Sequence, residues 1–384
     1  MKQPIRIGIL YSRSGNYQLL SDACHAGAMT GIAAVNADPA SRVELVPVER
    51  DPEGQIDRYA PLCEEIVRAG ARHVVGCVTS WSRKEVIPVL EKTGATLWYA
   101  CPYEGFEANE HVVYMHASPN QHLVPLFAHV LPRYGRNAYL VGSNYIWGWE
   151  TNRVARDLVQ DAGGQVLGER YLPLGDTDVS RLVAEIRAVR PSFVLNHLIG
   201  PSSYAFLAAL GEMAKEDTAF APERCPVLSC NLTEIELPAI GAAGEGQIAV
   251  GPWFLDAGEP WPWPAPSGLA AGAAPVPAEP SSFFVAAYSS VLVLADLLNH
   301  GQQAGAVAAD APLAFADRSF ATPFGEIAID PQTQHASLPV KIGRVRGGRF
   351  EIVESSEGRV DPDPYLSRYD PVRVFGRPNL RAVS

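Results

Sequence analysis

The sequence has few charged side chains and little basic character. Charged residues make up 19% of its 384 residues, and the net charge is −11. A nucleic-acid-binding protein needs a basic face against the phosphates, so this composition argues against that class. Apolar residues make up 47% of the chain, which is enough for sizeable cores. The length predicts two domains.

The sequence also shows no segment typical of a signal peptide or a membrane helix. The start, MKQPIRIGILYSRSG, offers an apolar run only from Ile5 to Tyr11, and Arg6 interrupts it. A signal peptide needs a longer run and a cleavage site, and no stretch approaches the apolar length of a membrane helix. We expect a cytoplasmic protein without membrane insertion. The alternative is a periplasmic protein from which a signal peptide has been removed.

Motifs for metals, cofactors and catalysis are absent as well. The cysteines form no CxxC pair and have no histidine cluster nearby, which argues against zinc; they are Cys24, Cys63, Cys77, Cys101, Cys225 and Cys230. The chain has no Walker loop, no HExxH and no nucleophile elbow. Residues 241–246 only weakly resemble a dinucleotide loop, since no strand directly precedes them. We therefore expect no metal and no cofactor.

What the chain does have is an alternation of short apolar strands with helical segments. Strands are predicted at 5–12, 43–49, 73–78, 96–101, 137–143, 166–172, 193–199, 227–232 and 247–253. Helical periodicity lies between them, with one helix beginning near Thr151 and another over 83–92. Continuous apolar strands joined by helices predict an α/β fold with parallel sheets covered on both faces.

The pattern changes after Trp253. Residues 255–280 are rich in Pro, Gly and Ala and predict a loop. A strong helix follows over 281–301, and residues 320–354 predict extended segments with a hairpin at Gly347-Gly348.

Ligands of parallel sheets bind beyond the carboxyl ends of the strands, and several of these ends carry aromatic and hydroxyl side chains. The first ends give Val78-Thr79-Ser80-Trp81-Ser82 and Pro102-Tyr103-Glu104; later ones give Ser143 to Trp149, Gly200 to Ser203, and Asn231. Taken singly, a Ser at a helix start is a cap, a Tyr belongs to the core, and His197 is a satisfied core group. Their coincidence at the strand ends instead predicts a pocket for a small polar molecule.

Two readings are open for the stretch GCVTSWSRKEVIPVLEKTGATLWYACPYEGFE, residues 76–107. It is either a catalytic strip with Cys77 or Cys101 as nucleophile, or a wall of a binding pocket. No Lys or His is placed to activate either thiol, so we favour a pocket wall and expect no enzymatic activity. Both cysteines then act as small buried apolar side chains.

This stretch, together with PNQ (119–121), VGSNYIWGWETNRV (141–154) and DPYL (363–366), resembles the amide sensors of aliphatic amidase operons. It is equally similar to the urea and short-chain amide binding proteins of ABC transporters. The resemblance runs from Ile7 to about Tyr365. It implies the type I periplasmic-binding-protein fold: two doubly wound parallel-sheet lobes joined by three hinge crossovers, with a ligand cleft between them. The lobes would be 1–118 plus about 254–325, and 119–253 plus about 326–384.

The resemblance also implies ligand contacts. The positions that match the family's site are Ser80, Tyr99, Pro102 and Tyr145, with Trp147 in place of another aromatic residue. Two positions depart from the sensors: Val78 replaces a Tyr, and Cys101 replaces a Thr. Relatives that bind amino acids hold the ammonium group with a carboxylate where this chain has Asn231, and Glu234 follows one turn later. A zwitterion would be poorly paired here, which favours a neutral ligand.

By this resemblance the protein binds an amide- or urea-like molecule and signals by lobe closure as a cytoplasmic sensor, with an RNA-binding antiterminator as partner. The alternative is the substrate-binding protein of an ABC transporter for amides, urea or branched-chain amino acids, with a permease as partner.

The two compartments predict different cysteine chemistry. If the chain's start is the native one, all six thiols stay reduced. Thiol titration of denatured native protein should then count six free groups; a count showing disulfides would contradict the cytoplasmic location.

Overall fold

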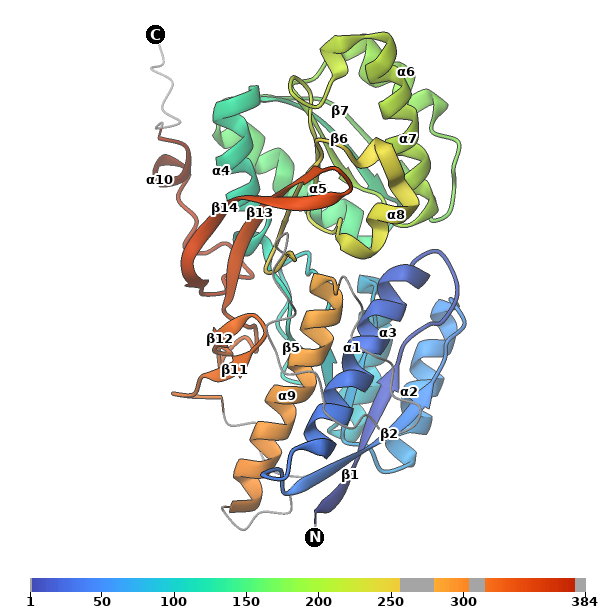
Figure 1. Cartoon of the computed structure of the whole chain (residues 1–384), viewed down its shortest axis with the longest axis vertical. Coiled ribbons are helices and arrows are strands. Elements are labelled where there is room, and N and C mark those ends of the chain that lie inside the picture. Colours follow the sequence, from blue (N-terminus) through green and yellow to red (C-terminus); the bar gives the residue numbers. More distant parts are fainter. Residues whose placement is uncertain (1, 256–279, 304–314, 377–384) are drawn as a thin grey trace.

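The computed structural model of the protein describes residues 2–255, 280–303 and 315–376. Two open sheets flanked by helices lie one above the other in Figure 1. The predicted α/β class with two parallel-sheet lobes is confirmed, and it matches the type I periplasmic-binding-protein fold.

The first sheet has five parallel strands in the order β2-β1-β3-β4-β5. Its strands are β1 (Gln3–Leu10), β2 (Val43–Arg50), β3 (His73–Gly76), β4 (Thr96–Tyr99) and β5 (Val112–Tyr114). The helices around it are α1 (Gln18–Ala37), α2 (Tyr59–Arg68), α3 (Ser80–Thr93) and α9 (Ser282–Gln303), with a short 3-10 turn at Ile56–Arg58. Strands β3, β4 and β5 are buried along their whole length, as expected for a parallel sheet covered on both faces.

The second sheet has seven strands in the order β14-β13-β10-β9-β8-β6-β7. The parallel ones are β6 (Asn137–Ser143), β7 (Gln165–Leu172), β8 (Phe193–His197), β9 (Val227–Ser229) and β10 (Ile248–Gly251); the antiparallel ones are β13 (Leu338–Arg346) and β14 (Arg349–Val360). The helices are α4 (Leu123–Tyr134), α5 (Ile146–Asp161), α6 (Ser180–Val189), α7 (Pro201–Glu216), α8 (Leu237–Ile240) and α10 (Pro371–Phe375). Short 3-10 turns lie at Pro119–Gln121, Thr218–Phe220, Glu234–Glu236 and Gly241–Gly244.

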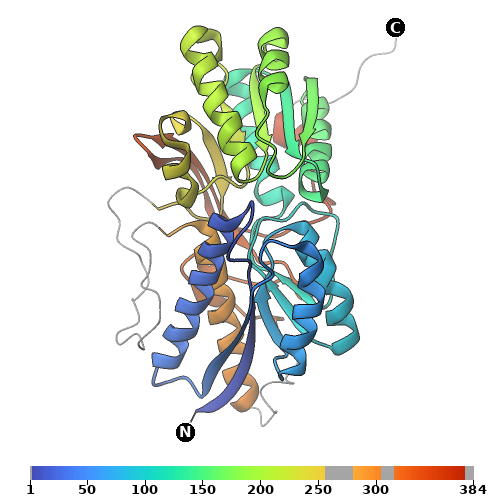
Figure 2. The same ribbon diagram turned by 90° about the vertical axis from the view of Figure 1, so that its right-hand side faces the viewer.

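The chain passes between the two sheets more than once. It leaves the first sheet after β5, returns from β10 to α9, and crosses again to reach β13. On the way it forms a small antiparallel pair, β11 (Phe320–Thr322) with β12 (Gly325–Ile327). Figure 2 shows α9 beside α1 against the first sheet, although more than 240 residues separate their first positions. The boundaries predicted for the two lobes stay a prediction.

Several predicted elements differ in extent from the structure. The helix expected over 83–92 begins earlier, at Ser80, because Thr79 and Ser82 cap it reciprocally. The helix expected near Thr151 likewise begins at Ile146. Strand β5 was not predicted, since its three residues are too few to show a pattern. The predicted hairpin at Gly347-Gly348 is confirmed, and most of the predicted 255–280 loop lies outside the described residues.

One helix in the described part of the chain contradicts the expectation about apolar length. Ser282–Gly301 has a mean hydropathy of 1.6 and is long enough to cross a membrane by length and composition alone. It is also 83% buried inside the fold, and a core helix of a soluble protein passes the same test. The apolar length is therefore explained by the packing of this helix against α1 and the first sheet.

The close approach of α1 and α9 depends on a glycine. A methyl group added at Gly27 would lie 2.2 Å from the carbonyl oxygen of Phe284, whereas one added at Gly211 in α7 would meet nothing nearer than 3.4 Å. Gly27→Ala should force the helices apart and lower the free energy of unfolding by about 1–3 kcal/mol. Gly211→Ala should raise it by up to about 1 kcal/mol through helix propensity. Urea unfolding measures both; equal effects would contradict this packing.

Candidate functional site

A small cavity lies where the carboxyl ends of strands from both sheets meet. Its lining residues are Tyr17, Leu20, Val78, Thr79, Ser80, Tyr99, Pro102 and Phe283 on the side of the first sheet, and Tyr145, Trp147, Ile199 and Asn231 on the side of the second. The free space inside is about 20 Å³, and a cavity needs roughly 10–15 Å³ to hold one water molecule. The two walls are therefore closed around a very small space.

The first wall is shaped by the turn from β3 into α3. Cys77 adopts a left-handed backbone conformation with φ of 64°, which a non-glycine residue adopts only at some cost in energy. The turn then ends in the Thr79–Ser82 capping box, where Ser82 N donates to Thr79 Oγ1 and Thr79 N donates to Ser82 Oγ, both at 3.1 Å. Ser82 is thus a cap, as expected of a Ser at a helix start. Ser80 is left free for another role.

A buried ion pair lies directly behind Ser80. The Ser80 hydroxyl donates to Glu104 Oε2 at 2.8 Å, and Arg83 Nη2 donates to Glu104 Oε1 at 2.6 Å. Arg83 Nε also donates to Glu107 Oε1 at 2.8 Å. The Arg83 side chain is 0% exposed. Burial alone would lower the pKa of Arg83, but Glu104 and Glu107 raise it well above its usual value, so the guanidinium stays charged.

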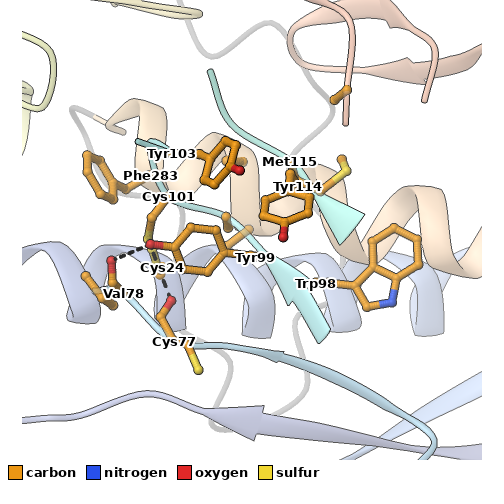
Figure 3. Packing of buried hydrophobic residues seen from close by; sticks show 14 of the residues in the cluster. Cys24, Cys77, Val78, Trp98, Tyr99, Cys101, Tyr103, Tyr114, Met115 and Phe283 are labelled. Carbon is orange, nitrogen blue, oxygen red and sulfur yellow. Dashed lines mark hydrogen bonds between the residues drawn. The ribbon is translucent and has the colours of Figure 1, made fainter. Parts of the chain in front are cut away.

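Aromatic rings enclose this guanidinium. Its central carbon lies 4.9 Å from the ring centroid of Tyr99, 5.1 Å from that of Tyr103 and 5.8 Å from that of Tyr114. The Tyr99 hydroxyl donates to the carbonyl oxygen of Val78 at 3.0 Å (Figure 3). Burial raises the pKa of Tyr99 well above 10, so its hydroxyl is neutral. The ion pair and the rings together fix the wall that carries Ser80 and Tyr99.

The second wall meets the first across the cavity mouth. The rings of Trp81 on α3 and Tyr145 before α5 are 5.3 Å apart between centroids. Trp81 is 37% exposed, whereas Tyr145 is only 2% exposed. Gly200, at φ of 59°, lies so close to Asn16 that an added methyl group would sit 1.8 Å from the Asn16 carbonyl oxygen. These contacts join the ends of the two sheets.

Behind Trp147 lies a buried group of imidazoles. The ring centroid of Trp147 is 5.5 Å from that of His197 and 6.0 Å from that of His122. Burial lowers the pKa of His122 to about 4 and that of His197 to about 3, so both are neutral near pH 7. His197 Nδ1 pairs with Asn152 Oδ1 at 3.0 Å, but its Nε2 and Trp147 Nε1 have no partner within the described residues. The expectation of a fully satisfied His197 holds for one nitrogen only.

The structure brings together seven of the eight residues predicted for the site: Val78, Ser80, Tyr99, Pro102, Tyr145, Trp147 and Asn231 all line the cavity. Cys101 does not. Its sulfur lies 3.9 Å from that of Cys24 and 3.7 Å from the carbonyl oxygen of Cys77 (Figure 3). The reason is that β4 ends at Tyr99, so residue 101 no longer follows the alternation of the strand. That these residues bind a ligand stays a prediction.

The catalytic reading of the thiols has no support in their surroundings. Burial raises the pKa of both Cys77 and Cys101 well above 9, so neither forms the thiolate that a nucleophile requires. Within residues 2–255, 280–303 and 315–376, no cluster of His, Cys, Asp and Glu side chains is suited to a metal ion.

Sequence reasoning missed several residues of the site. Tyr17 and Leu20 come from the start of α1, Ile199 follows β8, and Phe283 comes from α9, far along the chain. The strand-end rule signals only residues that directly follow strands. Ile199 was placed inside the strand predicted at 193–199, whereas β8 ends at His197. Glu104 and Arg83 were visible in the quoted stretch, but no spacing rule relates either of them to Ser80.

The comparisons with known proteins agree with this geometry. Residues 5–371 match the model of the periplasmic binding protein domain family. The chain belongs to this family. Solved structures that are similar to it include solute-binding proteins of ABC transporters. The amide-sensor branch suggested by the sequence is not among what the comparisons show.

Three solved structures illustrate the likeness. A solute-binding protein from R. palustris in complex with 4-hydroxybenzoate is 19% identical, with a TM-score of 0.74, covering 94% of this chain and 98% of its own. A second, from Rhodopseudomonas palustris HaA2 with p-hydroxybenzoic acid, is 21% identical, with a TM-score of 0.75 and coverage of 93% and 98%. A branched-chain amino acid binding protein from Streptococcus pneumoniae with isoleucine is 14% identical, with a TM-score of 0.71 and coverage of 94% and 100%. At these identities the likeness shows the fold.

The ion pair behind the cavity should be visible in acid unfolding. Burial pulls the pKa of Glu107 upward, but Arg83 and Lys84 outweigh it and bring this pKa from 4.5 to about 2. The unfolded chain therefore takes up the proton first as pH falls. Stability from Glu107, about 3 kcal/mol, should be complete above pH 4.5 and disappear toward pH 2.

Urea unfolding of the wild type and Glu107→Gln between pH 6 and pH 3 measures this contribution. The variant should be less stable at pH 6 and should lose less stability on acidification. If the two proteins lose stability in parallel over this range, the Arg83–Glu107 pair is not formed in solution.

Proposed function

We propose that this protein is the substrate-binding component of an ABC transporter and that it encloses a small, neutral, amide- or urea-like molecule between its lobes. The observation that carries the proposal is the closed cavity, whose lining comes from strand ends of both sheets. Relatives of this fold include transporter components that bind benzoates and isoleucine. The transporter role, which was the alternative in the sequence analysis, has more support than the sensor role.

The composition and size of the cavity support a small neutral ligand. The lining residues in the described part of the chain include no charged side chain; their polar side-chain groups are hydroxyls, the amide of Asn231 and the indole N–H of Trp147. A buried ionic ligand without a counter-charge is strongly disfavoured. A free space of about 20 Å³ also favours a small molecule over a large one. In the closed form, both features disfavour benzoates and branched-chain amino acids, which are larger and charged.

The carboxylate of Glu234, which follows Asn231 in the chain, is already engaged. Glu234 is buried; its Oε2 accepts from the Thr233 hydroxyl at 2.7 Å, and its Oε1 accepts from the Leu255 backbone N–H at 2.9 Å. It is not among the residues that line the cavity. An amino acid's ammonium group would therefore meet the Asn231 amide instead of a carboxylate, which supports the neutral ligand inferred from the sequence.

Lobe closure then supplies the signal. A ligand that contacts both walls stabilises the closed form, in which Trp81 packs on Tyr145. A permease would recognise that closed form. The chemistry required of this chain is binding alone, so we propose no enzymatic activity.

One observation favours the sensor role as a second candidate. Cys24 and Cys101 are both free thiols although their sulfurs are 3.9 Å apart. Such a pair persists most readily in a reducing compartment. A cytoplasmic sensor would use the same closure to act on an antiterminator partner.

A thermal-shift panel tests the ligand class. Amides, ureas, branched-chain amino acids and aromatic acids are each added to purified protein at pH 7. Neutral amide- or urea-like compounds should give the largest shift, because a ligand at 100 times its Kd stabilises the folded state by about 2.7 kcal/mol. Tyr145→Ala should abolish the shift by removing a second-wall contact, whereas Tyr365→Ala should retain it, since Tyr365 is 46% exposed and lies outside the cavity.

A shift with aromatic acids or leucine-like amino acids, and none with amides or ureas, would overturn the ligand class. A shift retained in Tyr145→Ala would instead place the ligand elsewhere.

A further inference from the structure

The cavity presents oxygen atoms whose hydrogen-bonding direction is already decided. A serine or tyrosine hydroxyl has one hydrogen to donate and lone pairs with which to accept. The Ser80 hydrogen goes to Glu104, and the Tyr99 hydrogen goes to the Val78 carbonyl. Within the described residues no donor reaches Ser80 Oγ or the Tyr99 hydroxyl oxygen. Toward a ligand, both hydroxyls are therefore acceptors.

The hydrogen bond from the Ser80 hydroxyl to Glu104 is not easily broken. The Glu104 side chain is buried, and Arg83 holds both of its oxygens, with Nη2 at 2.6 Å from Oε1 and Nη1 at 3.4 Å from Oε2. Arg83 is itself fixed by Glu107 and by three tyrosine rings. If Ser80 turned its hydrogen toward a ligand, a buried carboxylate oxygen would lose a hydrogen bond, which is costly in a dry interior.

We propose that Glu104 is a positioning residue for specificity: by holding the Ser80 hydroxyl as an acceptor, it makes the cavity select ligands that offer N–H donors over carboxylates of the same shape. This inference rests on the proposed function, because it assumes that the ligand occupies this cavity. It adds the residue that sets the preference and the direction of the hydrogen bond.

The preference follows from what each ligand brings to Ser80. The NH₂ group of an amide or urea donates to the free lone pairs of Ser80 and Tyr99. A carboxylate of the same shape has only oxygens, so it meets two acceptors with the Glu104 charge behind them. A charged carboxylate that finds no hydrogen-bond donor at these two hydroxyls should bind roughly 10- to 100-fold more weakly than the amide.

The experiment measures the ratio of the two affinities. Isothermal titration at pH 7 gives Kd values for the isosteric pairs acetamide and acetate, and propionamide and propionate. Glu104→Gln has nearly the same shape. Its amide oxygen can keep the bond to Arg83 while its NH₂ group donates to Ser80, which frees the Ser80 hydrogen for the ligand. The ratio of amide affinity to carboxylate affinity should be at least tenfold lower in this variant than in the wild type.

The matched control is Glu107→Gln, which alters the same ion pair but has no contact with Ser80; its ratio should stay within twofold of the wild type. A purely structural role for Glu104 would weaken both ligands equally and leave the ratio unchanged, and that result would overturn the inference. If Glu104→Gln fails to fold, Ser80→Ala replaces it: a fallen ratio supports the inference, and an unchanged one overturns it.

The wild-type arm separates this inference from the proposed function. A wild-type protein that binds the carboxylates and not the amides contradicts the ligand class itself. A wild type that prefers the amides, with a ratio that Glu104→Gln leaves unchanged, contradicts only the role of Glu104.

Discussion

The ion pair of Arg83 with Glu104 is the interaction on which the rest of the site depends. A fully buried guanidinium is tolerable only if it is paired and hydrogen-bonded. The pairing ties the first turn of α3, which carries Ser80, to the loop that follows Tyr99 at the end of β4. The same guanidinium lies against the ring of Tyr99. One buried charge thus determines where two cavity residues lie and which way their hydroxyls can bond.

The second wall follows a different principle. Tyr145 and Trp147 lie beyond the end of β6, and Asn231 lies beyond the end of β9, so the fold itself brings them to one edge. Nothing as rigid as the Arg83 ion pair holds them within the described residues. Trp147 instead backs onto two neutral imidazoles, and one of them, His197, has a nitrogen without a partner within those residues. A firm first wall and a second wall that meets it through ring contacts are consistent with closure around a ligand.

Local patterns predicted the α/β class, and the strand ends together with the family resemblance predicted most of the cavity. Apolar strands between helices indicate parallel sheets, and strand ends locate the pocket. Phe283 was not predicted as a cavity residue because long-range packing of α9 brings it to the site. Cys101 was assigned by resemblance, but the end of β4 turns its side chain toward Cys24. Glu104 escaped for a third reason: its role depends on a hydrogen bond to Ser80, 24 residues away, which no periodicity reveals.

The most direct measurement of the central claim is a crystal structure with the thioamide counterpart of the best amide ligand. Sulfur marks the position of the carbonyl oxygen by its anomalous scattering, so the NH₂ group is assigned without ambiguity. The account predicts the ligand in the cavity between the two sheets, with its nitrogen within hydrogen-bonding distance of Ser80 Oγ and its sulfur turned away. Sulfur against Ser80 Oγ, or a ligand bound outside the cavity, would contradict it.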